Sequence, residues 1–152
     1  MMPKWYGLSY PSETDLASFA ESLGAWVTIA KLPAALYVPG PPGEAPVILI
    51  PSQHGPLAAM WRLAHEIGHL VQHSGPKGDI FWSKGEAQAN RWAACALIPK
   101  ARIDAHSNAS IDAFIAALSA HYEDIPPRNC PLRSLANRIA RIRLGVLQSK
   151  NQ

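Results

Sequence analysis

The chain has 152 residues, of which 48% are hydrophobic and 16% are charged, and its formal net charge is +3. This length and apolar content predict one domain spanning residues 1–152 and exclude a disordered chain. No apolar run approaches the roughly 20 residues that cross a bilayer, the N-terminus lacks a signal-peptide core, and the two cysteines make no disulfide framework, so we expect a cytoplasmic protein without a membrane partner.

The first predicted elements are a helix over residues 12–23 and three strands. Ser12 can cap the helix, and a glycine follows its last residue. Strands are predicted at residues 26–30, 35–38 and 46–50, where β-branched and apolar residues lie between turn residues. The short connections between these strands favour antiparallel pairing in sequence order.

Residues 61–71 carry the strongest chemical signal, the pattern H-E-x-x-H formed by His65, Glu66 and His69. Apolar residues at helical spacing predict a helix, and residues four apart lie on one face about 6 Å apart along its axis. Two imidazoles so placed can bind one metal ion at roughly 2.0–2.1 Å, and Glu66 can accept a proton from water that the ion activates. Gly68 is a poor helix former and indicates close approach of substrate or a strand.

A catalytic zinc site needs a third protein ligand and an open fourth position. Glu86 opens a second predicted helix, residues 86–98, whose alanines allow close packing on the first helix. From the first turn of that helix its carboxylate could reach the ion, or it could simply be an acid favoured at a helix N-terminus. His73 would lie ~12 Å from His65 along the first helix, too far for one ion, so we interpret it as a helix-end histidine.

Two further helices are predicted, one beginning at Ser110 and one over residues 132–144 that Gly145 ends. Residues 125–152 hold six of the 14 Lys/Arg and none of the 11 Asp/Glu, so the basic character lies in a C-terminal helix and tail. A basic helix can contact phosphates, bind an acidic partner or be a solvated face. No aromatic interleaving, repeat or zinc-finger pattern supports the first, so we rank direct nucleic-acid binding below the other two.

The segment from Arg62 to Pro99 resembles the ImmA/IrrE-type metallo-endopeptidases. That family's pattern is an R-x-x-A-H-E-L-G-H helix and then a helix that begins E-x-x-A-N-x-F-A-A and ends L-L-M-P. The match is good over residues 62–99, with Trp92 in place of Phe and Ile98 in place of Met. Both replacements keep apolar volume, so neither casts doubt on the metal site.

The resemblance implies a gluzincin-like endopeptidase that uses Zn²⁺, although two histidines and one carboxylate would also suit Mn²⁺ or Fe²⁺. It places the metal ligands on His65, His69 and Glu86, and the catalytic carboxylate on Glu66. The implied substrate is a helix-turn-helix transcriptional repressor, whose cleavage induces phage, mobile-element or stress genes. The alternative is a non-cleaving regulatory module that keeps the zinc fold and grips a repressor or a toxin–antitoxin partner.

We therefore expect an α+β, zincin-like fold: a small three-stranded antiparallel sheet packed on a helical bundle that carries the H-E-x-x-H helix. In zinc peptidases of this design a sheet edge faces the metal cleft, and an extended peptide could add there as a strand. The plainer alternative is a sheet that only covers the helices.

Four further residues are weaker candidates for substrate or transition-state contacts. His54, Tyr37 and Arg91 could stabilise the oxyanion formed at the peptide carbonyl. An exposed loop histidine is the plainer interpretation of His54. Arg62, three residues before His65, could pair with an acid near the site or cover the helix face with its apolar stem.

Overall fold

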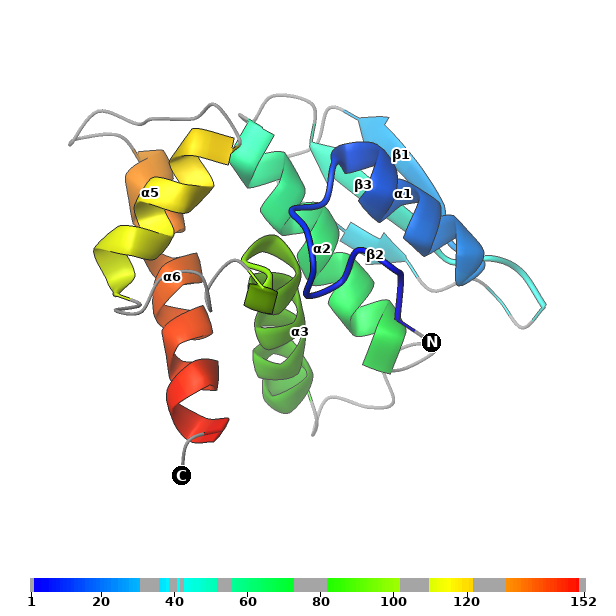
Figure 1. Cartoon of the computed structure of the whole chain (residues 1–152). Helices are drawn as coiled ribbons and strands as arrows, with labels where there is room; N and C mark the ends of the chain where they lie inside the picture. The colour runs from blue at the N-terminus through cyan, green and yellow to red at the C-terminus, as the bar shows by residue number, and fades with distance from the viewer. Residues whose placement is uncertain are drawn as a thin grey trace.

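The computed structural model has helices α2 and α3 side by side at its centre, a small sheet with α1 on one side of them, and α5 and α6 on the other (Figure 1). It describes residues 2–30, 36–38, 41, 43–51, 56–72, 82–101, 110–121 and 131–150. The elements are α1 Glu13–Ser22, β1 Trp26–Ala30, β2 Leu36–Val38, β3 Val47–Pro51, α2 Pro56–Gln72, α3 Trp82–Leu97, α5 Ile111–His121 and α6 Pro131–Lys150. The arrangement is α+β, as expected.

Helices α1 and α5 begin at the capping residues that the sequence predicts. The Ser12 hydroxyl accepts the Asp15 backbone N–H at 3.0 Å, and the Asp15 carboxylate accepts the Ser12 backbone N–H at 2.9 Å. This reciprocal pair satisfies two of the N–H groups that a helix start leaves without partners. The Ser110 hydroxyl accepts the Ala113 N–H at 3.2 Å and caps α5 through this single hydrogen bond.

The three predicted strands form at the expected places, but the prediction of an antiparallel sheet is wrong. The spatial order is β1–β3–β2, with β1 parallel to β3 and β2 antiparallel to it. The prediction failed because it assumed that strands adjacent in sequence pair with each other. In the central strand β3, Ile48 and Ile50 are buried, and Val47 and Leu49, which point to the opposite face, are half-buried.

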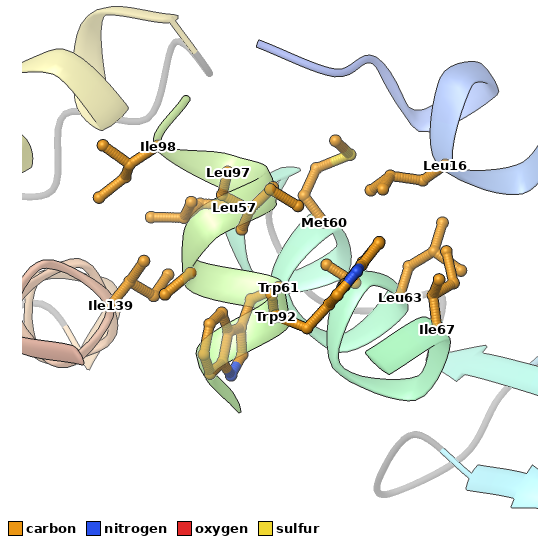
Figure 2. Packing of buried hydrophobic residues seen from close by; sticks show 14 of the residues in the cluster. Leu16, Leu57, Met60, Trp61, Leu63, Ile67, Trp92, Leu97, Ile98 and Ile139 are labelled. Atoms are coloured by element: carbon orange, nitrogen blue, oxygen red, sulfur yellow. The ribbon is translucent and has the colours of Figure 1, made fainter. Parts of the chain in front are cut away.

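The hydrophobic core forms between α2 and α3 and extends to both flanks. Leu16 from α1 and Ile139 from α6 enter it from opposite sides (Figure 2). From β3, Ile48 and Ile50 are also buried in it. The large side chains that come from α2, from α3 and from the residue after α3 are Leu57, Met60, Trp61, Leu63, Ile67, Trp92, Leu97 and Ile98.

Helix α6 is longer than the sequence predicts, because it continues past Gly145 to Lys150. A single glycine costs only about 1 kcal/mol in a helix, which tertiary packing readily offsets. Arg143 is 4% exposed, and its Nε donates a hydrogen bond to the Ile98 carbonyl at 2.9 Å. This carbonyl follows the C-terminal end of α3, where the helix dipole is negative, so the guanidinium ties α6 to the end of α3.

Helices α2 and α3 approach each other most tightly at Gly68. A Cβ atom placed on Gly68 would lie 2.8 Å from both the Cα and the carbonyl oxygen of Ala89, closer than real Cβ atoms come. The expected close approach is present, but the neighbour is the backbone of α3 rather than substrate or a strand. Only glycine allows this separation of the two helices.

Gly68→Ala should therefore destabilise the protein. Overpacking costs about 1–3 kcal/mol and should exceed the roughly 1 kcal/mol that alanine gains in helix propensity. Chemical denaturation measures the change in the free energy of unfolding. The control is Gly145→Ala on α6, where an added Cβ meets nothing within 4 Å, and this variant should be as stable as the wild type or more so. Equal effects of the two substitutions would contradict the steric explanation.

Candidate metal site

Two antiparallel helices present their polar side chains in matched pairs. Helix α2 carries His65 and His69, and α3 carries Glu86 and Asn90, so both pairs have the spacing of four residues that puts side chains on one helix face. His69 faces Glu86, and His65 faces Asn90 one turn further along. The two helices thus bring together a site that neither could form alone.

The three predicted ligands converge. His69 Nε2 lies 2.7 Å from Glu86 Oε1, His65 Nε2 lies 3.2 Å from Glu86 Oε2, and the two Nε2 atoms are 3.2 Å apart. Ligand atoms at roughly 2.0–2.1 Å from a tetrahedral ion lie about 3.3–3.4 Å apart, so these residues fit the ligand set of one metal ion. Among the described residues, this is the group of His, Cys, Asp and Glu side chains that could hold an ion.

Glu86 reaches the histidines from a different helical position than the sequence predicts. Helix α3 begins at Trp82 rather than at Glu86, so the carboxylate projects from the second turn and not from the first. Its role as a helix N-terminal acid, the alternative interpretation, is therefore wrong. Glu86 reaches the site because it lies directly opposite His69 where α2 and α3 pack together.

Asn90 is the site residue that the sequence interpretation missed. Its Oδ1 lies 2.7 Å from His65 Nδ1. Because an amide oxygen only accepts hydrogen bonds, this contact requires a proton on Nδ1, and the neutral imidazole then has its Nε2 lone pair available for a metal. The signal was present, since Asn90 follows Glu86 at the same spacing of four that defines the histidine pair.

Glu66 is a buried acid beside the three ligands. It is 8% exposed, and burial, followed by the charge of Glu86, raises its pKa to about 7, whereas the Arg62 charge one turn earlier acts in the opposite direction. Burial likewise lowers the pKa of His65, which favours the neutral imidazole that a metal ligand must be. A cation held by the ligands would favour the ionised form of Glu66.

The weaker candidates receive little support. Arg62 is half-buried on α2, and its charge opposes the rise in the pKa of Glu66, which fits either interpretation of this residue, a partner for an acid or a cover for the helix face. Arg91 is exposed on α3, and Tyr37 lies in β2 opposite Ile48. The predictions for His54 and His73 lie outside the described residues.

An H-E-x-x-H helix joined by a carboxylate from the next helix is the arrangement of a metallopeptidase site. The family comparison agrees: the family model described as the IrrE N-terminal-like domain, a peptidase family, matches residues 20–123, and the chain belongs to that family. This confirms the resemblance drawn from the motifs. Comparisons with curated proteins and with solved structures gave no match. No helix within the described ranges is long and apolar enough to span a membrane.

Metal binding should stabilise the folded protein. A free metal concentration of 100 times the Kd raises the free energy of unfolding by about 2.7 kcal/mol when the ion binds only the folded state. Thermal denaturation of metal-free protein with added Zn²⁺ measures this effect. Glu86→Ala should abolish most of it by removing one of three ligands, whereas Glu21→Ala removes an exposed carboxylate on α1 and should keep it. Full stabilisation of Glu86→Ala would exclude Glu86 as a ligand.

Burial of Glu66 should make the metal-free protein less stable as pH rises. The unfolded carboxyl releases its proton near pH 4.5 and the folded one near pH 7, so unfolding becomes easier between these values. The change is on the order of 3 kcal/mol and is complete above the folded pKa. Glu66→Gln cannot ionise, so it should match the wild type below pH 4.5 and exceed its stability at pH 8. Chemical denaturation in the presence of a chelator measures the free energy of unfolding of both proteins. Parallel curves of this free energy against pH would contradict the raised pKa of Glu66.

Proposed function

We propose that this protein is a zinc-dependent endopeptidase of the H-E-x-x-H, gluzincin type with a zincin-like fold, acting in the cytoplasm. The observation that carries the proposal is the convergence of His65 Nε2, His69 Nε2 and the Glu86 carboxylate within 3.2 Å of one another, with Glu66 buried beside them. Three protein ligands leave a fourth position for water or substrate, as in catalytic rather than structural zinc sites.

The chain's own residues have complementary roles in peptide hydrolysis. A divalent ion at this position supplies Lewis-acid activation of water and of the scissile carbonyl. Glu66 accepts the proton of the attacking water and then donates it to the leaving amine. Burial suits both steps, because it raises the proton affinity of the carboxylate, and the nearby Arg62 charge limits that rise.

The proposed substrate class is supported by the resemblance of the motifs to the family and not by the geometry of the site. We infer a protein substrate, a helix-turn-helix repressor whose cleavage induces phage, mobile-element or stress genes. An extended segment of it would add to an edge of the sheet, where β1 and β2 each have one side without a strand partner among the described residues. Neither direct nucleic-acid binding nor a membrane is needed for this function.

Glu66→Gln tests the proposed base. The amide has nearly the same shape but cannot accept the proton, so cleavage should fall by at least roughly 10²–10⁴-fold while Zn²⁺ affinity is kept. The assay incubates the Zn²⁺-loaded protein with helix-turn-helix repressors and detects fragments by mass spectrometry. Glu21→Gln, an exposed acid on α1, is the matched control.

Two outcomes would contradict the proposal. A Glu66→Gln variant that cleaves at the wild-type rate would remove Glu66 from the reaction. Wild-type protein that binds a repressor tightly without producing fragments would favour the non-cleaving regulatory module. The intact H-E-x-x-H glutamate argues against that alternative, because a binding module has no use for a buried base.

A further inference from the structure

His65 is held by two side chains of α3 that lie one turn apart. Its Nε2 faces Glu86 Oε2 at 3.2 Å, and its Nδ1 faces Asn90 Oδ1 at the shorter distance of 2.7 Å. The His65 side chain is only 14% exposed, so water cannot readily replace the amide. Both ring nitrogens are thus in use, one toward the site and one away from it.

The direction of the Asn90 contact has a chemical consequence. A neutral imidazole can carry its proton on either nitrogen, and only a nitrogen without a proton can bind a metal. Of the two neutral forms, only the one with the proton on Nδ1 donates a hydrogen bond to the Asn90 oxygen, and this contact is shorter than the one between Nε2 and the Glu86 carboxylate. His65 therefore needs no proton rearrangement before Nε2 binds an ion.

The amide also differs in charge from the carboxylate that could take the same place. Glu66 and Glu86 already put two acidic groups at the site, and like charges repel each other. A third carboxylate on α3 would add to this repulsion and would neutralise a divalent ion further. Asparagine orients the ring as an aspartate would, but it adds no charge.

We propose that Asn90 is a positioning residue of the metal site, which fixes His65 in its Nδ1-protonated form and does so without adding negative charge. This inference rests on the proposed function only in that the site holds a metal ion. It concerns a residue whose role the ligand pattern itself does not specify. Asn90 acts through His65 and contacts neither the ion nor the substrate.

Two measurements that need no substrate test this role. The first is Zn²⁺ affinity by competition with a chelator, where Asn90→Leu should raise the Kd about 10–100-fold, and Asn90→Asp should bind at least as tightly as the wild type. The second is the imidazole ¹⁵N spectrum of the metal-free protein, which reports where each ring proton lies. His65 should show a protonated Nδ1 in the wild type and in Asn90→Asp, and a mixture of both forms in Asn90→Leu.

The control is Asn137→Leu on α6, a half-buried asparagine whose Oδ1 accepts a hydrogen bond from Arg141 instead of from a site residue. It should leave both readouts unchanged. A wild-type Kd in Asn90→Leu, or a wild-type His65 with its proton on Nε2, would overturn the inference. The spectrum of the wild-type protein needs no variant, so it tests the inference even if Asn90→Leu fails to fold. Absence of proteolysis would count against the proposed function but leave both readouts interpretable, so the two failures can be told apart.

Discussion

The contact between Gly68 of α2 and the Ala89 backbone of α3 is the constraint on which the metal site depends. Two facing helices can match side chains turn for turn only if their separation and register are fixed. At this point the separation is set by the absence of a Cβ atom, since an added Cβ would meet the Ala89 Cα and oxygen at 2.8 Å. His69 follows Gly68 and Glu86 lies one turn before Ala89, so these two side chains meet beside the contact. The glycine that weakens α2 as an isolated helix thus makes the site possible.

The same close packing creates an electrostatic cost that a metal ion would relieve. Two imidazoles, two carboxylates and one guanidinium lie near a core of Trp61, Ile67 and Ala93, and burial disfavours the charged forms of both Glu66 and His65. Burial raises the pKa of the Glu66 carboxyl to about 7, so the protonated form is favoured relative to an exposed glutamate. A divalent ion reverses the balance, because it favours the ionised acid and the neutral histidine together. The protonation state of Glu66 and metal binding are therefore coupled, because the ion favours the ionised carboxylate and the ionised carboxylate favours binding of the ion.

Much of the site could be predicted from the sequence because its residues follow helical spacing. His65, His69 and Glu86 were identified from a spacing of four and from a second amphipathic stretch, and the structure brings them together. The strand pairing could not be derived, because local alternation of residues does not say which strands are neighbours, and β3 lies between two strands that precede it in the chain. Helix ends were also misjudged. Tertiary packing carries α6 past Gly145, and α3 begins at Trp82 although polar residues and Gly85 follow.

The basic C-terminal helix shows why net charge alone is a poor guide to function. Arg138 and Arg141 are exposed, which fits a solvated face as well as an acidic partner, whereas Arg143 is buried and bonded to the Ile98 carbonyl. Helix α6 lies beyond residues 20–123, which the family model matches, yet Ile139 is buried in the same core as α2 and α3. The metal ligands stand on α2 and α3, and Arg143 holds α3 by its C-terminal end. Helix α6 is thus bonded to α3, the helix that carries Glu86, at the end away from the metal ligands.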